Sequence, residues 1–165
     1  MLMEFMIDKD LAFFYGIMLG DGCLCQVIRK NRKSTYNFIT LTGSSKNDMP
    51  LFTDLIRPIL KKLRGKETKI KFYKSCNAIQ YNFCDIKLFN FLASLGFPIG
   101  LKLDKLFIPR IFYDLHLVEY IISGFFATDG GLVLTKNGNK YYPRLEAHVI
   151  SKTLLKEIFD YLSDL

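Results

Sequence analysis

The sequence has 165 residues, half of them apolar, and a formal net charge of +7. This length and apolar content are enough to bury a hydrophobic core, which excludes a disordered tail. The longest apolar run, residues 11–20, is too short to cross a bilayer, and Glu4 and Asp8 before it are unlike a secretory signal. We therefore expect an intracellular globular protein without a membrane partner, in a mitochondrion or chloroplast or in an archaeal or bacterial cytoplasm.

The positive charge is concentrated in one segment. Residues 29–74 carry thirteen Lys or Arg against three acidic residues, a local balance of +10, whereas the rest of the chain sums to −3. A polyanion is the natural partner of such a segment. A membrane surface fits less well, because the basic residues fall on predicted strands and turns and not on one amphipathic helix.

The four cysteines form two local pairs, Cys23 with Cys25 and Cys76 with Cys84, and neither pair has the two-residue gap of a zinc knuckle. Cys23 and Cys25 would point to the same side of an alternating strand, as small apolar residues do. We therefore expect reduced, buried thiols and not a zinc site.

The first part of the chain predicts helices alternating with hairpins. The order is helix, hairpin, helix, hairpin, helix, over residues 9–20, 23–30 with 35–42, 47–63, 67–74 with 78–84, and 85–95. Asp21 and Gly22 end the first helix; Pro58 is expected to kink the second, and Gly65 to close it. A turn at residues 31–34 joins the first hairpin, and a loop at residues 99–109 follows the third helix.

Alternation is clearest in the second hairpin. Ile79, Tyr81 and Phe83 alternate with Gln80 and Asn82, so one face is predicted to be core and the other amide-rich. The preceding strand is expected to place two residues on the core face and three on the polar face: Ile70 and Phe72, then Lys69, Lys71 and Tyr73.

The same order then begins again. A predicted helix, hairpin and helix follow at residues 115–128, 132–136 with 141–150, and 151–165, and the intervening Asn137-Gly138 is a strong turn signal. Asp21 and Asp129 are 108 residues apart, and the two Ser-Lys pairs that begin at Ser45 and Ser151 are 106 apart. So long a period predicts two halves, residues 1–109 and 110–165, related by a pseudo-twofold axis.

Each apolar helix ends in an Asp-Gly pair. A single pair of this kind is an ordinary signal for the end of a helix. The two helices also carry small residues at matching places. In each helix these residues are four positions apart: Gly16 and Gly20 in the first, Gly124 and Thr128 in the second. That spacing puts each pair on one helix face, where two backbones can approach closely. If these faces pack together, Asp21 and Asp129 lie side by side.

Two carboxylates brought that close repel each other unless a cation lies between them. Oxygen ligands without a His cluster suit Mg²⁺ or another hard divalent cation. Facing a nucleic-acid strand, such ions would activate a water and stabilise the leaving oxygen, which is hydrolysis of a phosphodiester.

Residues 14–22 read FYGIMLGDG and residues 122–130 read ISGFFATDG. Both resemble the LAGLIDADG motif of homing endonucleases, sharing its internal glycine (Gly16, Gly124) and its closing Asp-Gly. They depart at its first acidic position, where Leu19 and Ala127 stand. Because each motif leads into a predicted hairpin and helix, the resemblance extends over residues 9–165.

The resemblance implies an α+β fold of two αββαββα-type halves, with saddle-like antiparallel sheets that lie in the major groove and with the LAGLIDADG helices packed at the pseudo-twofold axis. It implies a site-specific double-strand DNA endonuclease, usually encoded in an intron or intein. Asp21 and Asp129 correspond to the metal-binding catalytic carboxylates, and the carbonyls of Gly20 and Thr128 to further ligands.

Two lysines and a set of polar residues complete the implied site. Lys46 and Lys152 are candidates for the side chain that orders waters around the scissile phosphate, with solvated lysines in a helix's first turn as the alternative. The residues expected to contact DNA are Arg29, Lys30, Arg32, Lys33, Lys69, Lys71, Tyr73, Gln80, Asn82, Arg144 and His148.

Two other classes of function stay open. One is a binding module without cleavage, such as a maturase that binds intron RNA or a DNA-binding regulator. The presence of both Asp21 and Asp129 favours cleavage over this class, because a pure binder has no use for two carboxylates at a helix interface. The other is a membrane-surface or scaffold protein, which leaves the repeated Asp-Gly unexplained.

The second half is expected to be incomplete. Only 36 residues follow Asp129, so at a spacing of 106 to 108 nothing corresponds to the strands and helix of residues 67–95. Leu145, Ala147 and Val149 would be uncovered, beside an unpaired strand edge. We expect the missing strands to come from a second polypeptide or from residues outside this chain.

Overall fold

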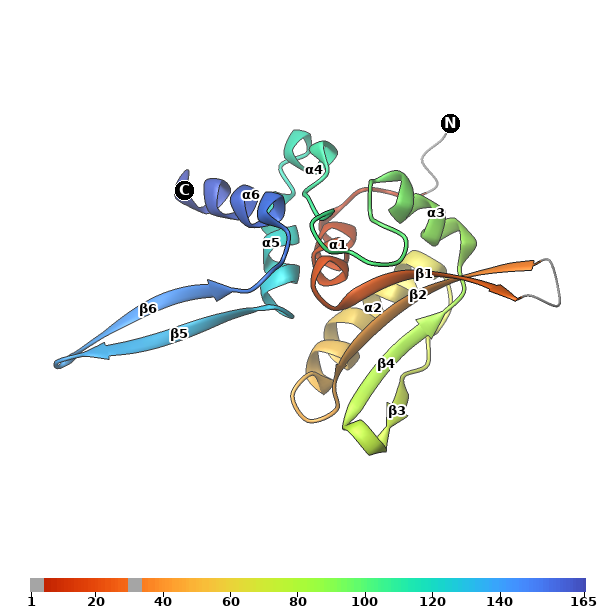
Figure 1. Cartoon of the computed structure of the whole chain (residues 1–165), viewed down its shortest axis with the longest axis horizontal. Coiled ribbons are helices and arrows are strands. Elements are labelled where there is room, and N and C mark those ends of the chain that lie inside the picture. Colours follow the sequence, from red (N-terminus) through yellow and green to blue (C-terminus); the bar gives the residue numbers. More distant parts are fainter. Residues whose placement is uncertain (1–4, 30–33) are drawn as a thin grey trace.

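The computed structural model describes residues 5–29 and 34–165. Its helices and strands follow the predicted order (Figure 1): α1 (Lys9–Asp21), β1 (Gly22–Arg29), β2 (Ser34–Ser44), η1 (Leu51–Ile56), α2 (Arg57–Arg64), β3 (Lys71–Tyr73), η2 (Lys74–Cys76), β4 (Ala78–Phe83), α3 (Ile86–Ser94), α4 (Arg110–Asp114), α5 (Val118–Phe126), β5 (Gly130–Asn137), β6 (Lys140–Ala147) and α6 (Lys152–Ser163). The predicted α+β class with antiparallel sheets is confirmed. No helix within the described ranges is long and apolar enough to cross a membrane.

The larger sheet has the strand order β1-β2-β4-β3 and is antiparallel throughout. Its core face carries Ile79, Tyr81 and Phe83 of β4, all buried, and between them Gln80 and Asn82 face the other way. The predicted alternation of β4 is therefore confirmed. The buried side chains belong to the same hydrophobic core as those of α1, α2 and α3.

Two parts of the first half differ from the prediction. Strand β3 is only Lys71–Tyr73, and Phe72, although opposite the buried Ile79, stays 60% exposed because it lies on the edge strand. The second difference is in the helix that precedes β3, where a kink at Pro58 was expected. Its first part is instead a π-helical segment, η1, because the N–H of Arg57 donates to the carbonyl of Phe52, five residues back. The π segment thus ends just before the proline that lacks an N–H. The predicted turn at residues 31–34 lies almost wholly outside the described residues.

The smaller sheet is the hairpin β5-β6, which extends away from the rest of the molecule (Figure 1). Asn137 pairs with Lys140, so the loop has two residues, and Gly138 at its first position has φ +60°, as a type II′ turn requires. The helix predicted at residues 115–128 is the shorter α5, preceded by the unpredicted α4. Strand β6 ends at Ala147, three residues before the predicted end.

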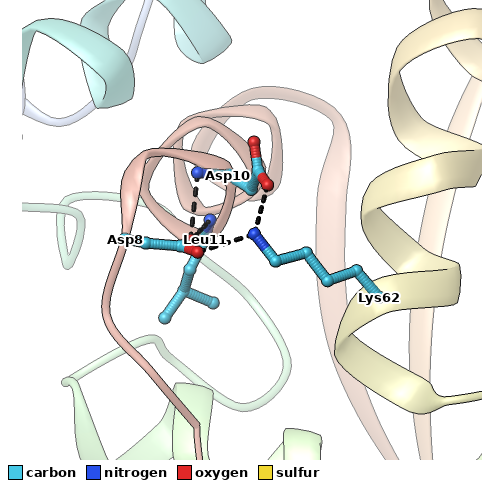
Figure 2. A network of polar contacts seen from close by, with 4 residues as sticks. All are labelled: Asp8, Asp10, Leu11 and Lys62. Carbon is cyan, nitrogen blue, oxygen red and sulfur yellow. Dashed lines mark hydrogen bonds and ion pairs between the residues drawn. The ribbon is translucent and has the colours of Figure 1, made fainter.

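Helix α1 is fixed at its beginning by the cluster of polar contacts in Figure 2. The carboxylate of Asp8 caps the helix by accepting hydrogen bonds from the N–H groups of Asp10 (3.1 Å) and Leu11 (3.0 Å). The ammonium of Lys62, on α2, lies 2.7 Å from Asp8 and 2.5 Å from Asp10. These contacts hold α1 against α2 at the end of α1 opposite Asp21.

Helices α1 and α5 pack directly against each other, as predicted. A Cβ added at Gly16 would come closer than 3.0 Å to the carbonyl of Ile121, and one at Gly124 would meet the carbonyl of Phe13 as closely. Real Cβ atoms essentially never make such contacts, so only glycine lets the two backbones touch here.

We expect Gly16→Ala to destabilise the fold by about 3 kcal/mol or more, because the methyl group would force α1 away from the backbone of α5. The measurement is denaturant-induced unfolding. Gly131→Ala is the matched control, because nothing lies within 4 Å of a Cβ at Gly131, and its stability should stay within about 0.5 kcal/mol of the native value. Equal stabilities of the two variants would contradict the close packing of α1 and α5.

Candidate functional site

The contact between α1 and α5 brings their carboxyl ends together. Asp21 is the last residue of α1, and Asp129 follows α5, with its N–H donating to the carbonyl of Phe125 at 2.9 Å. A Cβ built at Gly20 would lie 3.1 Å from a carboxylate oxygen of Asp129, so this carboxylate lies against the last turn of α1. The structure therefore brings together the two aspartates that the repeat singled out.

Both carboxyl groups are harder to ionise than usual. Burial raises the pKa of Asp21 to about 6, the negative charges of Asp129 and Asp48 act in the same direction, and Lys102 opposes them. Burial also raises the pKa of Asp129, again against the opposing effect of Lys102. At neutral pH the site therefore concentrates negative charge that a cation would stabilise.

Lys102 is the site residue that the sequence did not reveal. It lies in the segment between α3 and α4, and its ammonium donates to the carbonyls of Leu19 (2.9 Å) and Gly20 at the end of α1. Burial lowers the pKa of Lys102, while the charges of Asp129 and Asp21 counteract that effect. Nothing local marks this residue, because a lysine in a predicted loop is ordinary; only the fold carries it back to Asp21.

The carbonyl of Gly20, expected to bind metal, accepts a hydrogen bond from Lys102 in this structure. The hydroxyl of Thr128 donates to the carbonyl of Phe125 at 2.9 Å. The carboxylates of Asp21 and Asp129 are thus the oxygen donors best suited to a hard divalent cation. Over residues 5–29 and 34–165 no group of three or more His, Cys, Asp or Glu gathers, so such a cation would need water or phosphate oxygens to complete its coordination.

A cavity of about 260 Å³ opens beside Asp129. Its lining includes Lys102 and, from the segment after β6, His148. The sequence predicted that His148 contacts DNA, and this stays a prediction. The structure places His148 at the edge of the aspartate site. The remaining lining residues are Leu19, Gly20, Leu103, Leu106, Val149 and Ile150.

The two candidate lysines lie at exposed positions. Lys46 is in the turn after β2, where its N–H donates to the hydroxyl of Ser44 at 3.3 Å, and Lys152 is the first residue of α6, next to the cap Ser151. These are the positions expected of solvated lysines, the alternative stated for both. A role for either at the scissile phosphate stays a prediction.

The polar face of the larger sheet carries amide and hydroxyl groups. Gln80 donates to Thr42 at 3.1 Å and accepts from the hydroxyl of Tyr73 at 3.1 Å, and Asn82 lies opposite Thr40. Lys71, a predicted DNA contact, is exposed and pairs with Gln80 on this face, and Lys69, also exposed, precedes it by two residues, just before β3 begins. This face offers hydrogen-bond donors and acceptors beside positive charge.

The other predicted DNA contacts are distributed more widely. Arg144 is on β6, on the face opposite Leu145, and pairs with Glu146 at 3.0 Å. Arg29 is the last residue of β1. Lys30, Arg32 and Lys33 lie outside the described residues.

The cysteines match their prediction only in part. Cys23 and Cys25 are half-buried with their sulfurs 3.1 Å apart, and burial together with the neighbouring thiol raises the pKa of Cys23 to about 11, which keeps it protonated. Cys76 and Cys84 are exposed, not buried as expected. Cys76 lies in η2 between two strands and Cys84 directly follows β4, so both sit at strand ends.

The sequence matches no protein-family model and no curated protein sequence. Solved structures are similar to the chain in fold. The homing endonuclease I-DmoI in complex with DNA and Ca superposes with a TM-score of 0.61 at 18% identity, over 94% of this chain and 71% of that one. The LAGLIDADG meganuclease I-AabMI bound to uncleaved DNA gives 0.55 at 18%, over 95% and 73%.

A third structure, I-SmaMI bound to an uncleaved DNA target in the presence of calcium ions, gives a TM-score of 0.56 at 14% identity, over 96% of this chain and 74% of that one. These likenesses cover nearly all of the chain, 94% to 96% of it. The chain has the fold of the LAGLIDADG homing endonucleases.

Proposed function

We propose that this protein is a site-specific DNA endonuclease that hydrolyses one phosphodiester on each strand of a duplex, using divalent cations, Mg²⁺ in the first place, held by Asp21 and Asp129. The observation that carries this proposal is the pair of half-buried aspartates at the adjoining ends of α1 and α5. The fold supports it, because neighbours with the same architecture were solved with DNA and Ca, Mn or Mg.

Asp21 and Asp129 would hold the cation in their ionised forms, so binding requires a pH above the raised pKa of Asp21, about 6. When bound, such a cation would polarise a phosphoryl oxygen of the substrate and lower the pKa of a bound water. Lys102 keeps an ammonium group beside both carboxylates, where it can stabilise the negative charge that develops on a phosphate in the transition state. Its hydrogen bonds to α1 hold that ammonium in place.

The polar face of the larger sheet is the proposed duplex-binding surface. Lys69 and Lys71 would contact phosphates, which fix position without reading sequence. Gln80 and Asn82 on this face, and Arg144 on β6 of the smaller sheet, carry the amide and guanidinium groups that can read base edges in the major groove. We further propose that His148 contacts DNA close to the cut, since it lines the cavity that contains Asp129.

The alternative is a module that binds intron RNA or DNA without cutting it. The same basic segment would serve such a module, so binding alone does not separate the two functions. The aspartate pair favours cleavage, because two carboxylates that raise each other's electrostatic energy bring no benefit to a protein that only binds a polyanion.

We expect Asp21→Asn and Asp129→Asn each to abolish cutting of at least one strand while leaving duplex affinity nearly unchanged, because the ligand charge is lost and the sheet is untouched. The assay follows nicking and linearisation of a supercoiled plasmid that carries the intron-free host sequence, in Mg²⁺. Efficient linearisation by either variant would remove these residues from the catalytic role. If the native protein binds the plasmid but leaves it intact, the non-cleaving alternative holds.

The same assay tests Lys102. Lys102→Met should slow cleavage at least tenfold, because the lost ammonium is a positive charge that acts on both aspartates. Lys105→Met is the matched control, since Lys105 is an exposed lysine of the same segment. Equal cleavage rates for the two variants would show that Lys102 has only a structural role.

Duplex affinity is expected to fall steeply with salt, because each phosphate contact releases counterions. Replacing Lys69 and Lys71 together by Gln should reduce the slope of log affinity against log salt by about two units. The control pair is Lys9 and Lys156, exposed lysines on α1 and α6 that are not on the sheet. An unchanged slope for the Lys69 and Lys71 variant would move the duplex-binding surface elsewhere.

A further inference from the structure

The segment of residues 99–108 carries Lys102 to the end of α1, and β1 fixes the beginning of this segment. The N–H of Gly100 donates to the carbonyl of Leu24 at 2.7 Å. A tight turn follows, closed by a hydrogen bond of 3.0 Å from the N–H of Lys105 to the carbonyl of Lys102. At this turn the ammonium of Lys102 meets the last turn of α1.

The turn contains a strained residue. Leu103 has φ +43°, a left-handed conformation that bulky side chains rarely adopt. Such a conformation persists only where the surrounding structure holds the chain in place, and it is common at functional sites. Because β1 holds only the beginning of the segment, a second anchor is expected after the turn.

Helix α6 supplies that anchor through Ser151, its N-cap residue. Ser151 is fully buried, and its hydroxyl donates to the carbonyl of Leu106 at 2.7 Å. The carbonyl of Asp104 is also within reach of the hydroxyl, at 3.4 Å. A buried carbonyl that loses its donor costs free energy, so this contact stabilises the path of the chain directly after the turn.

A second contact from α6 fixes the end of the segment. The carboxylate of Glu157 accepts a hydrogen bond of 2.7 Å from the N–H of Ile108, a buried residue. Burial raises the pKa of Glu157, whereas this hydrogen bond acts in the opposite direction. The N–H of Ile108 and the carboxylate of Glu157 therefore stabilise each other, and α6 holds the segment at two points.

We propose that Ser151 and Glu157 are positioning residues, which hold residues 99–108 so that the ammonium of Lys102 stays at the end of α1. This inference rests on the proposed function, in which that ammonium stabilises the negative charge that develops on the phosphate during cleavage. Ser151 and Glu157 would thus act on the reaction through Lys102, whose position decides how close a positive charge lies to the phosphate.

Cleavage rates under single-turnover conditions test this role. Glu157→Ala should slow cleavage roughly 3- to 10-fold, because the buried N–H of Ile108 is left without its acceptor and the segment shifts. Glu157→Gln should cut within about twofold of the native rate, because its amide oxygen can accept the same hydrogen bond. Asp160→Ala is the matched control, since Asp160 is an exposed acidic residue of α6 that pairs with Lys156, and it should keep the native rate.

A double-mutant cycle separates positioning from a structural role. In the Lys102→Met background, Glu157→Ala should change the rate by less than about twofold, because the group that it positions is absent. A structural role would slow cleavage by the same factor in both backgrounds, and that result overturns the proposal. Equal rates for Glu157→Ala and Asp160→Ala in the native background would overturn it as well. Ser151→Ala provides an independent cycle with the same expected pattern.

Lysine labelling tests the placement of Lys102 without any cleavage. At a fixed pH the folded chain is treated with a trace of an acetylating reagent, and mass spectrometry gives the rate at each lysine. Glu157→Ala should raise the rate at Lys102 at least about threefold by local opening. The rate at Lys62, which pairs with Asp8 and Asp10, should stay unchanged, because only global unfolding would release both lysines.

The labelling result distinguishes this inference from the proposed function. If the native chain binds duplex but cuts neither strand, the proposed function fails, whereas faster labelling of Lys102 in Glu157→Ala still supports the positioning contacts. If Lys102 is labelled at the same rate in Glu157→Ala and in the native chain, the positioning role is overturned, even where Glu157→Ala slows cleavage.

Discussion

The contact between α1 and α5 is the constraint on which the rest of the structure depends. Gly16 and Gly124 each face a backbone carbonyl of the other helix, so the two helix backbones are in direct contact. That contact fixes the spacing of the aspartates at their carboxyl ends. It also fixes where the hairpins begin, because β1 starts at Gly22 and β5 at Gly130, directly after those aspartates.

The same contact has an electrostatic consequence. Asp21 and Asp129 are held in a half-buried junction, where burial alone disfavours their charged forms and the first is further disfavoured by the second. The positive charge of Lys102 partly compensates the negative charges of the two aspartates. Burial also disfavours the charged form of Lys102 itself. The junction therefore contains charges that the fold alone does not satisfy. This imbalance supports the proposal that the site binds a cation.

Much of this arrangement could be predicted from the sequence, because its causes are local or periodic. Glycines four residues apart predicted the helix contact, alternation predicted the buried face of β4, and the 108-residue spacing predicted that Asp21 and Asp129 are equivalent. The division at residues 109 and 110 stays a prediction, because side chains from both ranges share one hydrophobic core.

The parts that escaped prediction depend on contacts between distant segments. Lys102 reaches α1 from a segment more than eighty residues later in the chain, and no local pattern announces it. Phe72 has a core-facing register but stays exposed because of its edge position. The expectation of uncovered side chains after β5 is confirmed for Leu145, whereas Ala147 and Val149 pack partly against the core.

Thermal unfolding of the full chain with and without Ca²⁺ tests most directly whether the aspartate junction binds a cation. At pH 7.5 the account predicts that Ca²⁺ raises the Tm, and that at pH 4.5 the rise nearly disappears, because Asp21 is then protonated below its pKa of about 6. Asp21→Asn should raise the Tm at pH 7.5 without cation, since it removes a charge that burial penalises, and should abolish the response to Ca²⁺. An equal response to Ca²⁺ in the native chain and in Asp21→Asn would contradict the account.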